Sequence, residues 1–174
     1  MAILPIIVAP DPRLKLTCAP VARVDAEVAR LMDDMLETMY AAPGIGLAAP
    51  QLGVQKRVIV IDTARPGEVP CPIMLANPEL VATSEELKSW DEGCLSLPEH
   101  YAEVVRPSRV AVRYLDERNR KQEVEADGVL AVCLQHEMDH LDGILFVDHV
   151  SALKRNMILR KLRKAKKLGT LAAE

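Results

Sequence analysis

Two histidines one helical turn apart are the residues of this chain best suited to bind a metal ion. His136 and His140 flank Glu137 in the run QHEMDHLDG. Residues four apart on a helix lie on one face, so both imidazoles can reach the same ion. This is the His-Glu-x-x-His pattern of zinc hydrolases, in which a metal acidifies water and a carboxylate takes the proton. The pattern predicts a hydrolytic metal site with Glu137 as its base.

The alternative is a solvated surface helix that carries two unrelated histidines. Apolar residues on almost every side of the segment argue against it, because a helix that is hydrophobic all round is buried. Two histidines and a glutamate in a core need strong partners. We expect the helix to begin after Asp127 and to end at Gly143. The apolar residues are Val129, Leu130, Val132, Cys133, Leu134, Met138 and Leu141.

A catalytic site of this kind needs a third protein ligand and one open position. The extended metalloprotease pattern does not supply it, because Phe146 stands where that pattern has its last histidine. Upstream, Cys94 in the run DEGCLSLPEH is the best candidate, since thiolate binds zinc and iron strongly. The weaker candidates are Asp142, Asp148 and His149.

The other three cysteines, Cys18, Cys71 and Cys133, are expected to be small core residues. No two cysteines are close in sequence, so neither a zinc ribbon nor a redox pair is expected. Isolated cysteines suit a reducing compartment.

The run GIGLAAPQ, residues 44–51, has two glycines that let the backbone approach a ligand closely. It is neither a dinucleotide-binding fingerprint nor a phosphate loop, because the spacing of its glycines differs from both. Taken alone, the run could equally be a turn that ends a helix.

Together, GIGLAAPQ, EGCLSLP and QHEMDHL resemble, in this order, the motifs of the peptide deformylase family. The resemblance extends from about Ile3 to about Leu162. It implies hydrolysis of the N-formyl group from the N-terminal formylmethionine of nascent polypeptides, with release of formate. It also implies one divalent metal ion, with Fe2+ expected physiologically and Zn2+, Ni2+ or Co2+ possible in purified protein.

The resemblance also implies roles for individual residues. Cys94, His136 and His140 would hold the metal, and Glu137 would be the general acid and base. The Gln51 side chain and the backbone N–H of Leu95 would donate hydrogen bonds to the oxyanion. The substrate would bind as an extended strand in a cleft that includes Ile45, Gly46, Trp90 and Gly93, with its methionine in a pocket lined by Val129, Val132, Cys133 and His136.

Two further positions bear on this expectation. Many bacterial members of the family carry arginine where this chain has Tyr101, which puts a charge contact with the second substrate residue in doubt. Glu92 and Arg106 are expected to pair behind the ligands, with solvated surface charges as the alternative.

The hydrophobic periodicity predicts a helix over residues 26–41, capped by Asp25 and ended at Pro43-Gly44. Strands are expected at 58–62, around Met74, Leu80, Cys94 and Val105, and at 110–114 and 122–125. This order predicts an α+β fold, with antiparallel β-sheets wrapped around a central metal-binding helix. We expect residues 1–148 to form the catalytic domain and residues 149–174 to form a basic helical extension of the same domain.

Positive charge is concentrated in that extension. Residues 149–174 carry eight basic residues and one acid, Glu174, a net charge of +7, whereas the remainder has fourteen basic and twenty-four acidic residues, a net charge of −10. Leu153, Met157, Ile158 and Leu162 recur at helical spacing and predict one docking face. In relatives, such a basic helix binds the ribosome, a contact dominated by phosphate. A solvated terminal helix is the alternative.

No run approaches the roughly 18 apolar residues of a membrane span, and the apolar start ILPIIVAP is too short for a secretory signal. We therefore expect a cytoplasmic monomer that does not enter the membrane. Two other functions remain open: a metallopeptidase with a different third ligand, and a non-catalytic ribosome-binding protein whose metal has four ligands.

Overall fold

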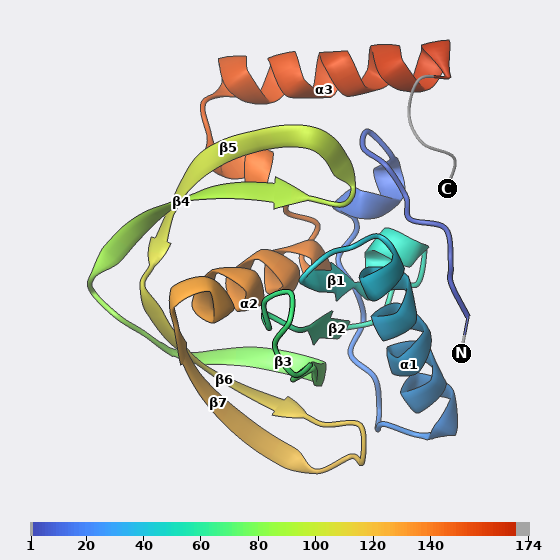
Figure 1. The fold of residues 1–174 in the computed structure, drawn as a ribbon, viewed down its shortest axis with the longest axis vertical. Coiled ribbons are helices and arrows are strands. Elements are labelled where there is room, and N and C mark those ends of the chain that lie inside the picture. Colours follow the sequence, from blue (N-terminus) through green and yellow to red (C-terminus); the bar gives the residue numbers. More distant parts are fainter. Residues whose placement is uncertain (1, 170–174) are drawn as a thin grey trace.

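A single helix, α2 (Gly128–Leu141), occupies the centre of the fold. The computed structural model describes residues 2–169. A five-stranded sheet lies on one side of α2 and a two-stranded sheet on the other, and α1 and α3 lie outside this arrangement (Figure 1). The predicted α+β fold, with antiparallel sheets around a central helix, is confirmed.

The larger sheet has the order β1-β2-β3-β6-β7, and every neighbouring pair is antiparallel. Its short strands, at one edge, are fully buried. The bounds are β1 Gly46–Ala48, β2 Val58–Ile61, β3 Ile73–Thr83, β6 Arg109–Leu115 and β7 Lys121–Asp127.

The prediction of separate strands around Met74 and Leu80 is wrong, because both residues belong to β3. The pairing of β3 with β6 shifts between Ala76 and Glu79. At this bulge Asn77 has a φ of 49°, which asparagine tolerates better than most residues. Its side chain also accepts a hydrogen bond from the backbone N–H of Val21 and donates one to the Val21 carbonyl. The Asn-Pro pair therefore bends the strand without ending it.

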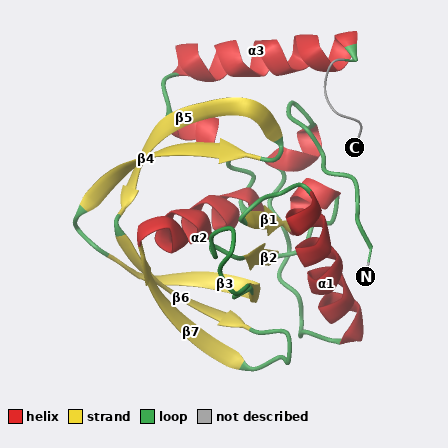
Figure 2. Cartoon of the chain, in the orientation of Figure 1, coloured by secondary structure: helices red, strands yellow, loops and turns green. Residues whose placement is uncertain are grey.

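The smaller sheet is a long ribbon of β4 (Leu87–Cys94) and β5 (Leu97–Pro107), shown in yellow beside α2 in Figure 2. Residues 95–96 form the turn between the two strands, so Cys94 lies at the tip of the ribbon. Three short 3-10 helices complete the description: η1 (Pro12–Lys15), η2 (Ala49–Leu52) and η3 (Phe146–His149).

Helix α1 (Ala26–Ala41) has the predicted bounds, and the Asp25 carboxylate accepts a hydrogen bond from the backbone N–H of Val28. This contact satisfies one of the donors that a helix start leaves unpaired. Its buried apolar face consists of Val28, Met32, Met35 and Met39, whereas Leu31 and Leu36 are half-buried.

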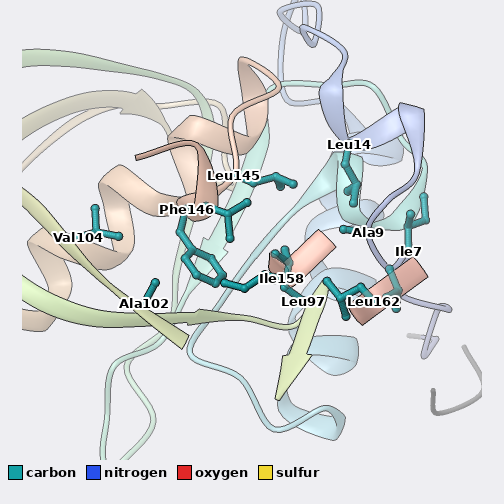
Figure 3. Close-up of a cluster of buried hydrophobic side chains, with 12 residues drawn as sticks. Ile7, Ala9, Leu14, Leu97, Ala102, Val104, Leu145, Phe146, Ile158 and Leu162 are labelled. Carbon is teal, nitrogen blue, oxygen red and sulfur yellow. The ribbon is translucent and has the colours of Figure 1, made fainter. Parts of the chain in front are cut away.

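Helix α3 (Ala152–Leu168) packs on the body of the protein through Ile158 and Leu162. In Figure 3 both side chains lie with Leu97, Phe146 and Ile7 in one buried cluster. The predicted docking face was too wide, because Leu153 and Met157 are 74% and 47% exposed. Successive helical residues are rotated by about 100°, so these two positions point away from the narrow stripe that Ile158 and Leu162 define. Within residues 2–169, no helix combines the length and the apolar character that a membrane span requires.

Candidate metal centre

Three side chains from two elements converge at one face of α2. Cys94 comes from the tip of the β4–β5 ribbon, and His136 and His140 come from one face of α2. One donor atom from each lies within 4.8 Å of the others, and the Cys94 Sγ is 3.4 Å from the His140 Nε2. Among residues 2–169, this is the only such group of three metal-binding side chains.

The weaker candidates for the third ligand are engaged elsewhere. Asp142 pairs with Arg57, Asp148 pairs with Lys15, and His149 pairs with Asp139. Asp142 follows the last residue of α2, where the chain turns away through Gly143 at a φ of +74°. The predicted end of the helix is thus confirmed. Its predicted start at Asp127 is also confirmed, although the Asp127 side chain makes no capping hydrogen bond.

The donor set fits a divalent cation such as zinc or iron. One thiolate and two imidazoles form an accepted ligand set that leaves a coordination position open. Two buried atoms of this site, the Glu137 Oε2 and the His140 Nδ1, have no hydrogen-bond partner among the described residues. Because a buried polar atom without a partner is costly, such a cluster is characteristic of a site that binds a polar group or an ion.

His136 is oriented by a carboxylate on its far side. Its Nδ1 is 2.9 Å from the Glu92 Oε1, and a carboxylate only accepts hydrogen bonds, so Nδ1 must donate. Nε2 therefore carries the lone pair that a metal requires. Arg106 holds Glu92 with two hydrogen bonds of 2.6 and 2.9 Å.

The Glu92–Arg106 pair was expected either behind the ligands or on the surface, and the structure buries it. The two side chains are 3% and 5% exposed. Burial raises the pKa of Glu92, but the hydrogen bonds from His136 and Arg106 outweigh this effect and bring the pKa to about 2. Glu92 is therefore ionised at neutral pH and accepts the hydrogen bond from the His136 N–H.

Glu137 has the opposite environment. Its side chain is 6% exposed, and its Oε1 lies 4.0 Å from the His136 Nε2. Burial raises the pKa of Glu137 to about 7, with the nearby His136 ring opposing the rise. A carboxyl group with a pKa close to neutral pH can both accept and release a proton under cellular conditions.

The side chain of Gln51 is fixed with its amide nitrogen toward the site. The Gln51 Oε1 accepts a hydrogen bond from the Ala48 N–H at 2.9 Å, which leaves the Nε2 as the group that faces Cys94. This nitrogen is 3.6 Å from the Cys94 Sγ and donates to the Ser96 Oγ at 3.0 Å. A fixed N–H donor beside the ligands is the arrangement needed to stabilise a developing oxyanion.

The glycines of the GIGLAAPQ run are required by close packing. A Cβ atom on Gly46 would lie 2.6 Å from the Glu137 Oε1 and 2.7 Å from the Cys133 Sγ. A Cβ atom on Gly44 would lie 2.7 Å from the Leu95 side chain. The run therefore follows the end of α1 and also brings β1 directly against α2.

An open cavity of about 830 Å³ leads to these residues. The predicted site residues that line it are Ile45, Gly46, Gln51, Gly93, Cys94, Leu95, His136 and Glu137. Tyr101 also lines it, with its ring over Gly93: a Cβ atom there would lie 2.6 Å from the ring.

Four residues that were expected to contact substrate do not line this cavity: Trp90, Val129, Val132 and Cys133. Val129 is 47% exposed in the first turn of α2, and Val132 is half-buried. Cys133 lies behind the backbone of residues 45–46, with its Sγ 3.6 Å from the Ile45 carbonyl. Burial raises the pKa of the Cys133 thiol, as expected for a core residue. Trp90 lies four residues before the ribbon tip and pairs with Val104.

Sequence reasoning missed one wall of the cavity. Residues 3–6 and Val8 line it together with the C-terminal end of α1. The segment is held in place because the Ile7 N–H donates to the Gln51 carbonyl and the Ala9 N–H donates to the Ser96 carbonyl. No polar motif marks this apolar segment. Its only signal in the sequence was that the resemblance to the family begins at about Ile3.

Comparison with known proteins relates this chain to one family. The sequence profile described as Polypeptide deformylase matches residues 3–156. A peptide deformylase from Methylocella silvestris is 60% identical over 97% of this chain and 87% of its own length. One from Agrobacterium fabrum is 54% identical over 95% of this chain and 97% of its own length. The crystal structure of a peptide deformylase from Ehrlichia chaffeensis superimposes with a TM-score of 0.92 at 39% identity, covering 98% of this chain and all of the other.

Proposed function

The chain belongs to the polypeptide deformylase family, and on this basis we propose that Cys94, His136 and His140 hold its metal ion and that Glu137 transfers the proton. The reaction is the hydrolysis of the N-formyl group from the N-terminal formylmethionine of nascent polypeptides, which releases formate. The observation that carries the assignment is the convergence of three donor atoms within 4.8 Å beside the buried Glu137.

When bound, the metal supplies Lewis-acid activation of water and of the formyl oxygen. The Glu137 carboxylate accepts a proton from the attacking water and returns it to the leaving nitrogen. In the metal-free site, burial raises the pKa of this carboxyl group to about 7. The Glu92 carboxylate keeps the His136 ring in the tautomer that leaves Nε2 free for coordination.

The Gln51 Nε2 and the backbone N–H of Leu95 donate hydrogen bonds to the oxyanion. The support for Gln51 is its fixed orientation, with the carbonyl end bonded to Ala48 and the amide end beside Cys94. The support for Leu95 is its position directly after Cys94, where it lines the same cavity. Donors fixed before the reaction cost no reorganisation when charge develops.

The substrate binds as an extended strand beside Ile45 and Gly46. Strand β1 is an edge strand of the larger sheet, and such an edge offers backbone groups to a peptide. Gly93 lies across the same cavity. Tyr101 lines this cavity at the position where many bacterial members carry arginine, so this position supplies no charged side chain to the second substrate residue.

The direct test measures formate release from formyl-Met-Ala-Ser. We expect formate to form in proportion to the peptide consumed, to cease when a chelator strips the metal, and to return when a divalent metal is added. Acetyl-Met-Ala-Ser, which lacks the formyl group, is the control and should not react. Cleavage of the internal peptide bonds without formate would instead indicate a metallopeptidase.

We assign Fe2+ as the physiological metal. A thiolate ligand favours iron as well as zinc, and ferrous iron beside a thiolate is sensitive to oxygen. We expect iron-loaded protein to lose its deformylase activity faster in air than under argon, whereas zinc-loaded protein should decay equally in both. Equal lifetimes of the iron-loaded protein in air and under argon would exclude this assignment.

The exposed face of α3 binds the ribosome. Arg160, Arg163 and Lys164 are exposed there, while Ile158 and Leu162 hold the opposite side of the helix on the body. Phosphate contacts release counterions, so the affinity should fall steeply with salt.

Changing Arg160, Arg163 and Lys164 together to glutamine should reduce co-sedimentation with ribosomes. The slope of log affinity against log salt should become shallower by about one for each phosphate that the variant no longer binds. The matched control changes the exposed residues Arg118, Arg120 and Lys121, which lie at the far end of the larger sheet. Equal binding by both triple variants would contradict the assignment.

The chain acts as a cytoplasmic monomer in which residues 1–148 and 149–174 form one domain. The burial of Ile158 and Leu162 against the body supports a single domain, although residues 170–174 lie outside the described part of the chain. The four cysteines are free, as is usual in a reducing compartment.

A further inference from the structure

A continuous series of hydrogen bonds leads from His136 to His149, a residue at the end of η3. His136 donates to Glu92 at 2.9 Å, and Arg106 donates to Glu92 at 2.6 Å. The Arg106 Nη1 donates to the Asp139 Oδ2 at 2.9 Å, and the His149 Nε2 lies 2.8 Å from that same oxygen. Because a carboxylate only accepts, His149 Nε2 is a donor.

The burial of these side chains decreases steadily from the site to the surface. Glu92 and Arg106 are 3% and 5% exposed, Asp139 is 22% exposed, and His149 is 35% exposed. Asp139 is therefore the carboxylate of the series that is open to solvent, and its Oδ2 accepts hydrogen bonds from both Arg106 and His149. Without His149, the Asp139 carboxylate has one partner fewer and more freedom to turn toward water, which weakens its hold on Arg106.

A second contact joins the same short helix to the same ring. Phe146, at the start of η3, stacks on His136 with ring centroids 6.2 Å apart and an interplanar angle of 24°. The two ends of η3 are thus linked to His136 in different ways. Phe146 packs on its ring, and His149 is connected to it by the hydrogen bonds through Asp139, Arg106 and Glu92. Ser151, which caps α3, follows two residues after His149.

We propose that His149 is a positioning residue of the metal centre, which acts through Asp139, Arg106 and Glu92 to hold the His136 ring in its ligating orientation. This inference rests on the proposed ligand set of Cys94, His136 and His140. Partners that orient a ligand directly contribute about 10- to 100-fold to metal affinity. Since His149 acts through three intermediates, we expect a smaller effect, about three- to ten-fold in the rate of metal release.

The test compares His149→Asn with His149→Gln in Co2+-loaded protein. The glutamine amide can occupy the place of the histidine Nε2 and donate to Asp139, whereas the asparagine amide stands nearer the backbone, at the place of Nδ1. Both variants are polar at a partly exposed position, so both suit the fold. Lys15→Met is the control, because it removes a neighbouring ion pair to Asp148 in η3 that does not touch this series.

We expect His149→Asn to release Co2+ to a chelator about three- to ten-fold faster than wild type and to alter the visible absorption of the Co2+ centre. His149→Gln and Lys15→Met should both resemble wild type. The proposal is overturned if His149→Asn releases Co2+ at the wild-type rate with an unchanged spectrum, or if His149→Gln is as fast as His149→Asn. Wild-type protein without a thiolate-to-Co2+ absorption band would overturn the ligand set, and this inference with it.

Discussion

Replacing Glu137 with alanine should abolish deformylation while leaving the metal content unchanged. The three donor atoms come from other residues, so the site can still bind its ion. The proton acceptor is lost, and general acid–base groups typically contribute about 10²- to 10⁴-fold to the rate. Formate release from formyl-Met-Ala-Ser and metal content per chain, measured on the same preparation, check both parts of this expectation.

The matched control is Glu123→Ala, which removes an exposed carboxylate on β7 far from the site. It should retain both activity and metal. Normal turnover of metal-loaded Glu137→Ala would remove Glu137 from the mechanism. Loss of the metal along with the activity would show instead that this carboxylate is needed to build the site.

Replacing Cys94 with alanine should have an effect on the metal itself. A residue that merely orients a ligand contributes about 10- to 100-fold to affinity, so loss of a ligand should lower affinity by more than about 100-fold. Formate release should fall in parallel. In Co2+-loaded protein, the absorption band from thiolate to metal should disappear. Elemental analysis and the visible spectrum measure these outcomes directly.

Cys71→Ala is the control for this experiment. The prediction that Cys71 is a core residue is wrong, because it is an exposed free cysteine outside the cavity. It should keep the metal, the absorption band and the activity. Full metal occupancy and an intact thiolate band in Cys94→Ala would mean that another sulfur is the ligand.

The elements that were predicted well are those with local signals. Asp25 as a cap and Pro43-Gly44 as a stop both act within a few residues of the helix that they bound, so the limits of α1 followed from sequence. The spacing of His136 and His140 on one helix is also local. Asn77-Pro78 lies between Met74 and Leu80, where two separate strands were expected, and a bulge and a turn use the same residue types. Only the pairing of β3 with β6 distinguishes them.

The site residues that sequence did not reveal depend on contacts between distant segments. Ser96 meets Gln51, and Asp139 meets His149, only after the ribbon and η3 have packed against α2. The same holds for the width of the α3 docking face, because a periodic pattern shows which residues share a side but not how much of that side is covered. For these residues, contacts and burial are determined by tertiary packing and not by the local sequence.

The position of Cys94 at a hairpin tip has a consequence for folding. Cys94 at the ribbon tip and His140 on α2 lie 46 positions apart in the sequence. A cation held by all three is a removable crosslink that closes this long loop. At a free concentration one hundred times its dissociation constant, such a ligand stabilises the native state by about 2.7 kcal/mol. The ion would therefore raise the free energy of unfolding of the chain as well as supply its chemistry.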